Sequence, residues 1–231
     1  MATHIKNMLG VFGRGRHLAL LISLLLLFLI SPFVAAARYG TVVINTAGAI
    51  VLLSGIYAMS EQRRLFVVAL IGSVAAIATN LLMVVFQSEW IAIVWHGFAL
   101  VLLGLFSVGI LEDVLRHGRI SADKIRGAIC VYLLIGFAWA FGYGIIELMN
   151  PGSFSGLAEI DVNNHAGRMM QMQYFSFATL TTLGFGDILP RSSAARTLAT
   201  LEAMTGQIYL AVLIARLVGL HIVHSTSPTG D

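Results

Sequence analysis

Residues 169–187 read MMQMQYFSFATLTTLGFGD, and this stretch decides the architecture predicted for the chain. Its first part, 169–181, is apolar and aromatic but too short to cross a membrane as a helix, which takes about 20 residues. Its second part, 182–187, has glycine at alternate positions and ends in a carboxylate. A short apolar run beside an irregular loop is typical of a segment that enters a membrane and turns back. This interpretation requires that the flanking sequence be that of a membrane protein.

The composition meets that requirement. Of the 231 residues, 58% are hydrophobic and 11% are charged, whereas soluble domains are about half apolar and about a quarter charged. The net charge of +3 is small and the basic residues form no stripe with aromatics, so no nucleic-acid partner is predicted. The single cysteine, Cys130, excludes an internal disulfide and a cysteine zinc cluster. No catalytic constellation is recognisable, so neither an enzyme nor a bound cofactor is predicted.

Six stretches are apolar over the length that a helix needs to cross a hydrocarbon core about 30 Å thick. They lie at 18–37, 41–59, 65–86, 90–111, 128–148 and 197–220. Because backbone groups in lipid must pair within their own segment, each is predicted to be a helix. The first could instead be a cleaved leader, since Ala35-Ala36-Ala37 resembles a cleavage site. Its apolar run is long enough to span a membrane, and we expect it to be retained.

The distribution of basic residues predicts the orientation in the membrane, because cytoplasmic loops are enriched in lysine and arginine. With the N-terminus inside, nine basic residues lie in inner segments: Lys6, Arg14, Arg16, Arg63, Arg64, Arg116, Arg119, Lys124 and Arg126. Four lie outside: Arg38, Arg168, Arg191 and Arg196. We therefore expect a multi-pass protein of the cell membrane with both termini in the cytoplasm and residues 149–196 outside.

At 181–187, TTLGFGD resembles the TVGYG-type selectivity-filter signature of potassium channels, and it lies between a short helix and a last span, as in that family. The last span, with LEAMTGQIYLAVLIARLVG at 201–219, is similar to the inner helix of the bacterial potassium channel family. The resemblance covers residues 128–221. It implies a re-entrant pore helix and a selectivity-filter loop, and with the six apolar stretches it gives an all-α integral membrane protein with six transmembrane helices. It also implies a homotetramer that conducts K⁺ passively, with K⁺ as the permeant ligand.

The resemblance places the ion-binding groups in the filter segment, which we define as residues 182–186. K⁺ would be bound by the carbonyl groups of Thr182, Leu183, Gly184 and Phe185, with Gly186 completing the filter. Rings of backbone carbonyls can replace the water around a dehydrating cation. Alternate residues must then adopt left-handed backbone angles, which glycine permits at low cost, as at Gly184 and Gly186. One loop per chain implies that four chains surround the axis.

Other residues receive supporting roles from the same resemblance. Asp187 is expected at the outer mouth, and Thr181 and Glu202 are expected to support the filter. A carboxylate in lipid is costly unless it is paired, so Glu202 is expected to brace the pore helix through Thr179 or Thr181. Gly206 could be a gating hinge or a point of close packing, and both interpretations stay open. Gln207 and Ile214 are expected to line the cavity below the filter.

Phe185 departs from the family pattern, which commonly has tyrosine at this position. The tyrosine hydroxyl bonds to an aromatic residue of the pore helix, and phenylalanine has no such group. The pore helix here has Phe175 and Phe177 but no tryptophan. We therefore expect a filter that is held more loosely.

The predicted domains are a four-helix transmembrane module at 1–111, a cytoplasmic linker at 112–127, a pore module at 128–221 and a short tail at 222–231. Voltage sensors have an arginine at every third position of the fourth span. Residues 90–111 contain no arginine and only one histidine, His96, so no voltage sensor of that kind is predicted.

Two other functions remain as alternatives. One is a weakly selective channel that passes both Na⁺ and K⁺, which the intact TLGFGD sequence disfavours. The other is a subunit of a potassium uptake transporter. Such proteins have four filter-like loops in one longer chain, whereas this chain of 231 residues has one.

Overall fold

A computed structural model of the chain describes residues 15–34, 40–60, 63–86, 88–115, 121–157 and 165–225. Five described helices precede the loop between α6 and α7: α2 Arg16–Val34, α3 Gly40–Ala58, α4 Arg63–Phe86, α5 Glu89–Leu115 and α6 Ala122–Met149. They are followed by β1 Phe154–Ser155, α7 His165–Leu180, β2 Leu189–Pro190 and α8 Ser193–Ser225. The strands β1 and β2 pair antiparallel, with Phe154 opposite Pro190.

Each of the six predicted apolar stretches overlaps a described helix, and residues 35–37 of the first stretch lie outside the described residues. Among the described residues, five helices are long and apolar enough to cross a membrane, and the apolar part of α3, Val42–Ala58, is shorter. An almost entirely helical protein with five such helices is a multi-pass membrane protein. Helix α5 continues to Leu115 and α6 begins at Ala122, so both extend into the stretch 112–127 that was predicted to be a linker. Ser121 caps α6 by accepting a hydrogen bond from the Lys124 backbone nitrogen, at 3.3 Å.

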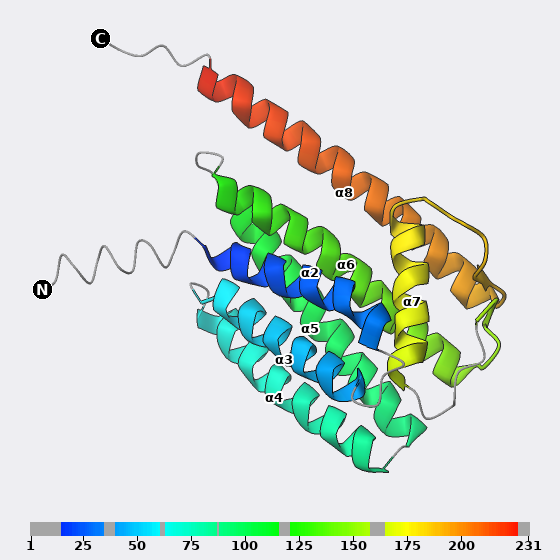
Figure 1. The fold of residues 1–231 in the computed structure, drawn as a ribbon. Helices are drawn as coiled ribbons and strands as arrows, with labels where there is room; N and C mark the ends of the chain where they lie inside the picture. Colours follow the sequence, from blue (N-terminus) through cyan, green and yellow to red (C-terminus); the bar gives the residue numbers. More distant parts are fainter. Residues whose placement is uncertain are drawn as a thin grey trace, which may run out of the picture.

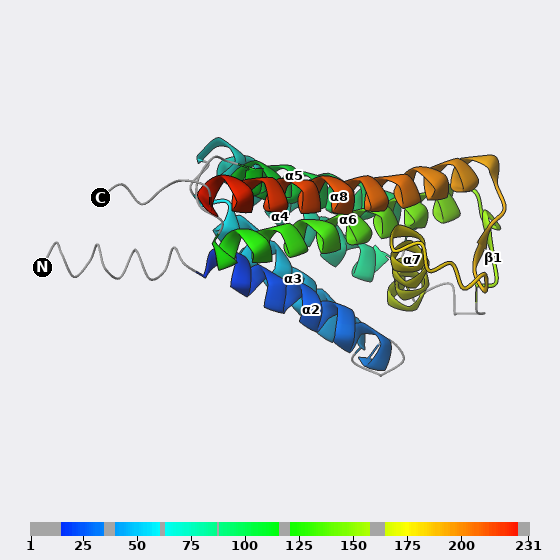
Figure 2. The ribbon, with the colours of Figure 1, turned by 90° about the horizontal axis from the view of Figure 1, so that it is seen from above.

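The helices α2 to α6 run alternately up and down, and α6 packs against both α2 and α5 (Figure 1). A shared apolar core joins these three helices. The buried core side chains of these three helices include Leu20, Leu24, Phe106, Ile110, Val131 and Leu134. Helix α8 packs on α6 and α7. The start of α2 and the end of α8 lie at the same end of the bundle, and α7 lies at the other end (Figures 1 and 2).

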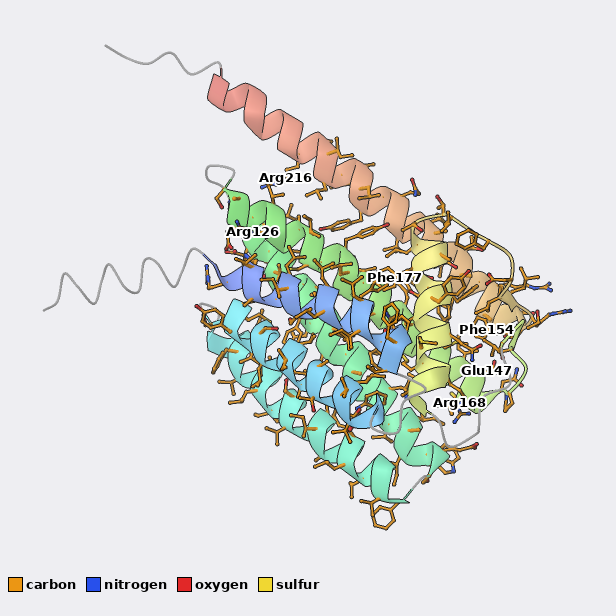
Figure 3. The ribbon with its side chains drawn as sticks, viewed as in Figure 1. Arg126, Glu147, Phe154, Arg168, Phe177 and Arg216 are labelled. Carbon is orange, nitrogen blue, oxygen red and sulfur yellow. The ribbon has the colours of Figure 1, made fainter. Side chains whose placement is uncertain are left out.

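Phe177 links α7 to the first described helix as well as to α6 (Figure 3). Its ring lies edge-on to Phe28 of α2, with centroids 4.9 Å apart, and to Phe137 of α6, with centroids 5.4 Å apart. Gly136 of α6 faces the same ring, and a Cβ there would lie 2.7 Å from it. Edge-to-face pairs of this kind add about 0.5–1.5 kcal/mol to the burial of the rings.

The outer loop is fixed by a carboxylate and by an aromatic cluster. Glu147, near the end of α6, accepts hydrogen bonds from the backbone nitrogens of Gly152, at 2.8 Å, and Phe154, at 3.1 Å. Phe154 in turn packs edge-on against Tyr143 of α6 and Phe175 of α7, with centroids 5.5 and 5.2 Å apart. These contacts hold β1, and through it β2, against the helices that flank the filter segment.

We expect Gly136→Val to lower the melting temperature of the purified protein, because the new side chain must displace the Phe177 ring. Overpacking of this kind typically costs about 1–3 kcal/mol. The matched control is Gly142→Val in the same helix, where a Cβ would meet nothing within 4 Å. Equal melting temperatures for the two variants would contradict the close approach of α6 and α7.

Candidate functional site

The filter segment begins where α7 ends, and the turn between them is tightly hydrogen bonded. The backbone nitrogen of Thr182 donates to the Thr179 carbonyl at 2.9 Å, and that of Leu183 donates to the Ala178 carbonyl at 2.8 Å. The backbone nitrogen of Gly184 also donates to Ala178, at 3.2 Å. These bonds satisfy carbonyl groups that a helix end leaves unpaired. They keep the filter segment next to the partial negative charge at the C-terminus of α7, which favours a cation.

The backbone of the filter segment alternates between left-handed and ordinary angles. The φ angle is 57° at Thr182, 57° at Gly184 and 81° at Gly186, whereas Leu183 and Phe185 have negative φ. Thr182 is the one non-glycine residue with positive φ among the described residues. A β-branched residue in this region is strained by about 1–3 kcal/mol, and such strain persists where the surroundings impose it. The sequence predicted the two glycines, and it missed Thr182 because threonine rarely adopts these angles.

Residues 181–187 are exposed in the single chain. They include two large apolar side chains, Leu183 at 58% and Phe185 at 66% exposure. Apolar side chains this exposed beside a glycine-containing loop are typical of a surface that another chain or an apolar medium covers.

Tyr174 of α7 holds the outer end of the filter segment. Its hydroxyl donates to the Asp187 carboxylate at 2.8 Å, and its ring stacks on Phe185 with centroids 6.3 Å apart and planes 6° apart. The bond from Tyr174 lowers the pKa of Asp187 below its ordinary value, because it stabilises the ionised carboxylate. Phe185 therefore has a partner on α7 despite lacking a hydroxyl. The sequence analysis overlooked Tyr174, although its phenol was the signal for such a bond.

Glu202 is fully buried and joins three helices. Its Oε2 accepts a hydrogen bond of 2.5 Å from the Tyr143 hydroxyl of α6, and its Oε1 lies 2.5 Å from the Ser176 hydroxyl of α7. The expectation that Glu202 contacts Thr179 or Thr181 is wrong. The Thr181 hydroxyl donates to the Phe177 carbonyl, at 2.6 Å.

The register of α8 on α7 explains this difference. Gly206 packs directly on the Leu180 carbonyl at the end of α7, where a Cβ would overlap the oxygen. Glu202 lies one turn before Gly206, and it therefore meets Ser176, which lies one turn before Leu180. This contact favours close packing as the reason for Gly206. Its role as a hinge stays a prediction.

The hydrogen atoms around Ser176 can be counted. Its oxygen lies 2.7 Å from the Gly136 carbonyl, which can only accept, and 2.5 Å from Glu202 Oε1. A serine hydroxyl has one hydrogen to donate. Both contacts are fully satisfied when the Glu202 carboxyl supplies a hydrogen to Ser176 and Ser176 donates to Gly136.

The two expected cavity residues lie at different distances from the filter segment along α8. Gln207 Nε2 donates to the Thr182 hydroxyl at 3.4 Å, so Gln207 is placed directly next to the filter segment. Ile214 is exposed and lies two turns further along α8. Among the described residues, no three His, Cys, Asp or Glu side chains are grouped so as to hold a metal ion.

Comparison with known proteins bears on this part of the chain. Residues 155–220 match the sequence model of a family described as "Ion channel". The match begins in β1 and ends in α8, so it contains α7, the filter segment, and Glu202 with its partner Ser176. Neither the curated proteins nor the solved structures gave a match. The family match, together with the apolar helices, supports an ion channel.

We expect Tyr174→Phe to raise the pKa of Asp187 toward its ordinary value. The bond from Tyr174 is present while Asp187 is ionised and is lost as the pH falls through the lowered pKa. Without the hydroxyl, Asp187 will take up its proton at a higher pH. The measurement is a carboxyl-carbon NMR titration of labelled protein, with Asp187→Asn to identify the signal. An unchanged midpoint would show that the hydroxyl does not act on Asp187.

We expect Glu202→Ala to destabilise the protein more than Glu202→Gln. Alanine leaves the buried Tyr143 hydroxyl without its partner, at about 1–3 kcal/mol, while Ser176 keeps its bond to the Gly136 carbonyl. Glutamine keeps an acceptor for Tyr143 and a donor for Ser176. Thermal unfolding in detergent measures the difference, and equal losses for the two variants would contradict the hydrogen-bonding role.

Proposed function

We propose that the chain is one subunit of a homotetrameric, potassium-selective channel of the cell membrane. In this proposal K⁺ passes through the axis, bound by the carbonyl groups of Thr182, Leu183, Gly184 and Phe185. Both chain ends face the cytoplasm, and no voltage sensor with arginines is involved. The observation that carries the proposal is the alternation of left-handed angles at Thr182, Gly184 and Gly186. Such alternation can turn successive carbonyls toward the same side, as coordination of a dehydrated cation requires.

Three further observations support the proposal. The filter segment follows the C-terminus of a helix that is too short to span a membrane, and that end has a partial negative charge. Its exposed apolar side chains, Leu183 and Phe185, would become buried when chains assemble around an axis. The start of α2 and the end of α8 lie at one end of the bundle, opposite α7, as two cytoplasmic termini require (Figure 1).

A weakly selective Na⁺ and K⁺ channel is the second candidate. The observation that favours it is the contact between Phe185 and Tyr174, which is stacking without a hydrogen bond. Stacking restrains a ring less strictly in direction than a hydrogen bond does. The relative flux of the two ions separates the candidates.

The test is ion flux into proteoliposomes under K⁺ or Na⁺ gradients, with and without barium. We expect flux that is selective for K⁺ and blocked by barium. Gly184→Ala should reduce it at least about tenfold, because alanine does not favour φ of 57°. The matched control is Gly152→Ala, which places the same strain at φ of 85° in the outer loop, away from the filter segment. The control should keep its flux.

Two outcomes would contradict the proposal. Equal K⁺ and Na⁺ flux would favour the weakly selective channel. A purified protein that is monomeric and conducts neither ion would exclude a tetrameric pore. If both glycine variants lose their flux, the loss in Gly184→Ala reflects general backbone strain. It then gives no information on the filter segment.

A further inference from the structure

The ring of Phe177 on α7 lies against rings from two other helices (Figure 3). Phe28 of α2 meets it edge-on, with centroids 4.9 Å apart and planes at 72°. Phe137 of α6 meets it in the same way, with centroids 5.4 Å apart and planes at 81°. All three side chains are part of the apolar core of the bundle. The contact of Phe28 is therefore a direct link between the first described helix and the helix that precedes the filter segment.

Phe177 is also the residue at which the turn before the filter segment begins. Its carbonyl accepts hydrogen bonds from the backbone nitrogen of Thr181, at 3.1 Å, and from the Thr181 hydroxyl, at 2.6 Å. The next carbonyl, that of Ala178, accepts from the backbone nitrogen of Leu183 at 2.8 Å. Thr182, with its φ of 57°, lies between these two bonded residues. A strained angle persists only where the surroundings impose it, so Phe177 and Ala178 are among the residues that hold Thr182 in this conformation.

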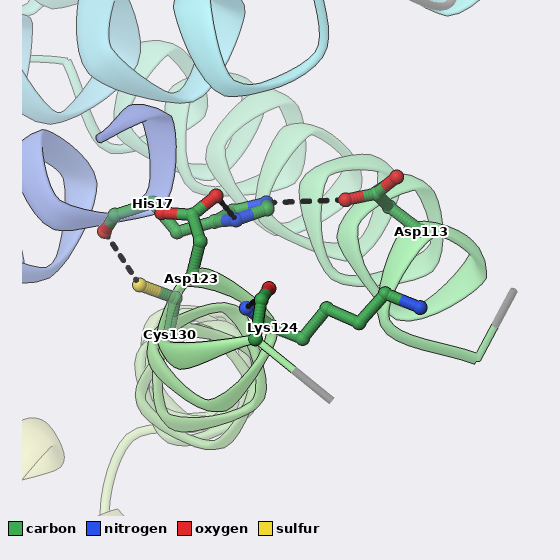
Figure 4. A network of polar contacts seen from close by, with 6 residues as sticks. His17, Asp113, Asp123, Lys124 and Cys130 are labelled. Atoms are coloured by element: carbon green, nitrogen blue, oxygen red, sulfur yellow. Dashed lines mark hydrogen bonds and ion pairs between the residues drawn. The ribbon is translucent and has the colours of Figure 1, made fainter. Parts of the chain in front are cut away.

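Helix α2 is itself fixed to its neighbours. Near its start, His17 Nδ1 lies 2.8 Å from Asp123 Oδ2, and the His17 carbonyl accepts a hydrogen bond from the Cys130 thiol at 3.4 Å (Figure 4). Further along, the Ser23 hydroxyl lies 2.8 Å from the Ser54 hydroxyl of α3. These contacts join α2 to α6 and α3, and sliding of α2 along either helix would break them. The second half of α2 therefore meets α7 at one level.

The contact with α7 belongs to one face of α2. Phe28 is half-buried and packs against the apolar core. Phe33, in the last turn of the same helix, is 84% exposed. Truncation of either residue removes the same ring from the same helix, but only truncation of Phe28 removes a neighbour of Phe177. This difference allows the contact to be tested against a residue of the same type.

We propose that Phe28 is a positioning residue for the filter segment, and that selectivity for K⁺ depends on its contact with Phe177. Phe28 acts by keeping the last turns of α7 in place. Without its ring, Phe177 loses its support from α2, and the turn that imposes the angle of Thr182 relaxes. Discrimination between K⁺ and Na⁺ depends on the number and placement of the carbonyl groups around the ion, so a relaxed turn admits Na⁺ more readily. This role rests on the proposed function, whereas the ring contact does not.

The test is the ratio of Na⁺ flux to K⁺ flux in proteoliposomes. We expect Phe28→Ala to raise this ratio at least about threefold, in line with the stabilisation that one edge-to-face ring pair provides. The matched control is Phe33→Ala, which makes the same truncation at the exposed ring of α2 and should keep the ratio of the unmodified protein. A loss of folded protein lowers both fluxes together, so a defect in folding alone leaves the ratio unchanged.

Further variants test whether the effect passes through Phe177. Phe28→Tyr keeps an aromatic ring and should keep the ratio. Phe177→Ala should raise the ratio, and adding Phe28→Ala to it should raise the ratio no further, because both truncations remove one contact. Additive effects of the two truncations would overturn the path through Phe177. Phe28→Leu keeps an apolar side chain but has no ring, so it should raise the ratio as well, and it decides the result if Phe28→Ala does not fold.

The failure of this role and the failure of the proposed function are distinguishable. K⁺-selective flux with the same ratio in the unmodified protein, Phe28→Ala and Phe28→Leu overturns the positioning role and leaves the proposed function standing. Equal changes in Phe28→Ala and Phe33→Ala also overturn the positioning role, because they reflect the loss of an apolar ring in the membrane and not the contact with α7. An unmodified protein without K⁺-selective flux contradicts the proposed function, and the positioning role is then overturned with it.

Discussion

The buried carboxyl of Glu202 is the contact on which the geometry of the filter segment depends. It is held by hydroxyls of α6 and α7 while it lies on α8, so its two bonds fix three helices at one level. One turn further on, Gly206 allows α8 to lie against the carbonyl at the end of α7. The last turn of α7 thereby has a fixed position, and the strained angle of Thr182 follows directly after it.

The first four spans are part of the support of α7. Helix α6 packs on α2 and α5 through a common apolar core, and Phe177 of α7 lies between rings of α2 and α6. These contacts join α2, α5, α6 and α7 into one packed unit.

The helices and the filter segment were predictable because their signals are local. Long apolar runs predict spans in lipid, and the glycines at 184 and 186 predict left-handed angles. The partners of the site residues were not predictable, because they depend on the register between helices far apart in the sequence. Glu202 was expected opposite Thr179 or Thr181, and a shift of about one turn places it opposite Ser176. Tyr174 and His17 have no sequence signal beyond their residue type, and only packing shows what they contact.

The contact between Phe28 and Phe177 joins residues 149 positions apart (177 − 28). Contacts of such long sequence separation form late in folding, because a large loop must close before they contribute. Helix α7, which leads into the filter segment, therefore completes its packing only after α2 has folded. During synthesis α2 is made long before α7. Until α7 is made, the Phe28 ring lacks its contact with the Phe177 ring. Chains truncated before α7, or lacking α2, should accordingly be poor partners for assembly, since neither can complete this contact.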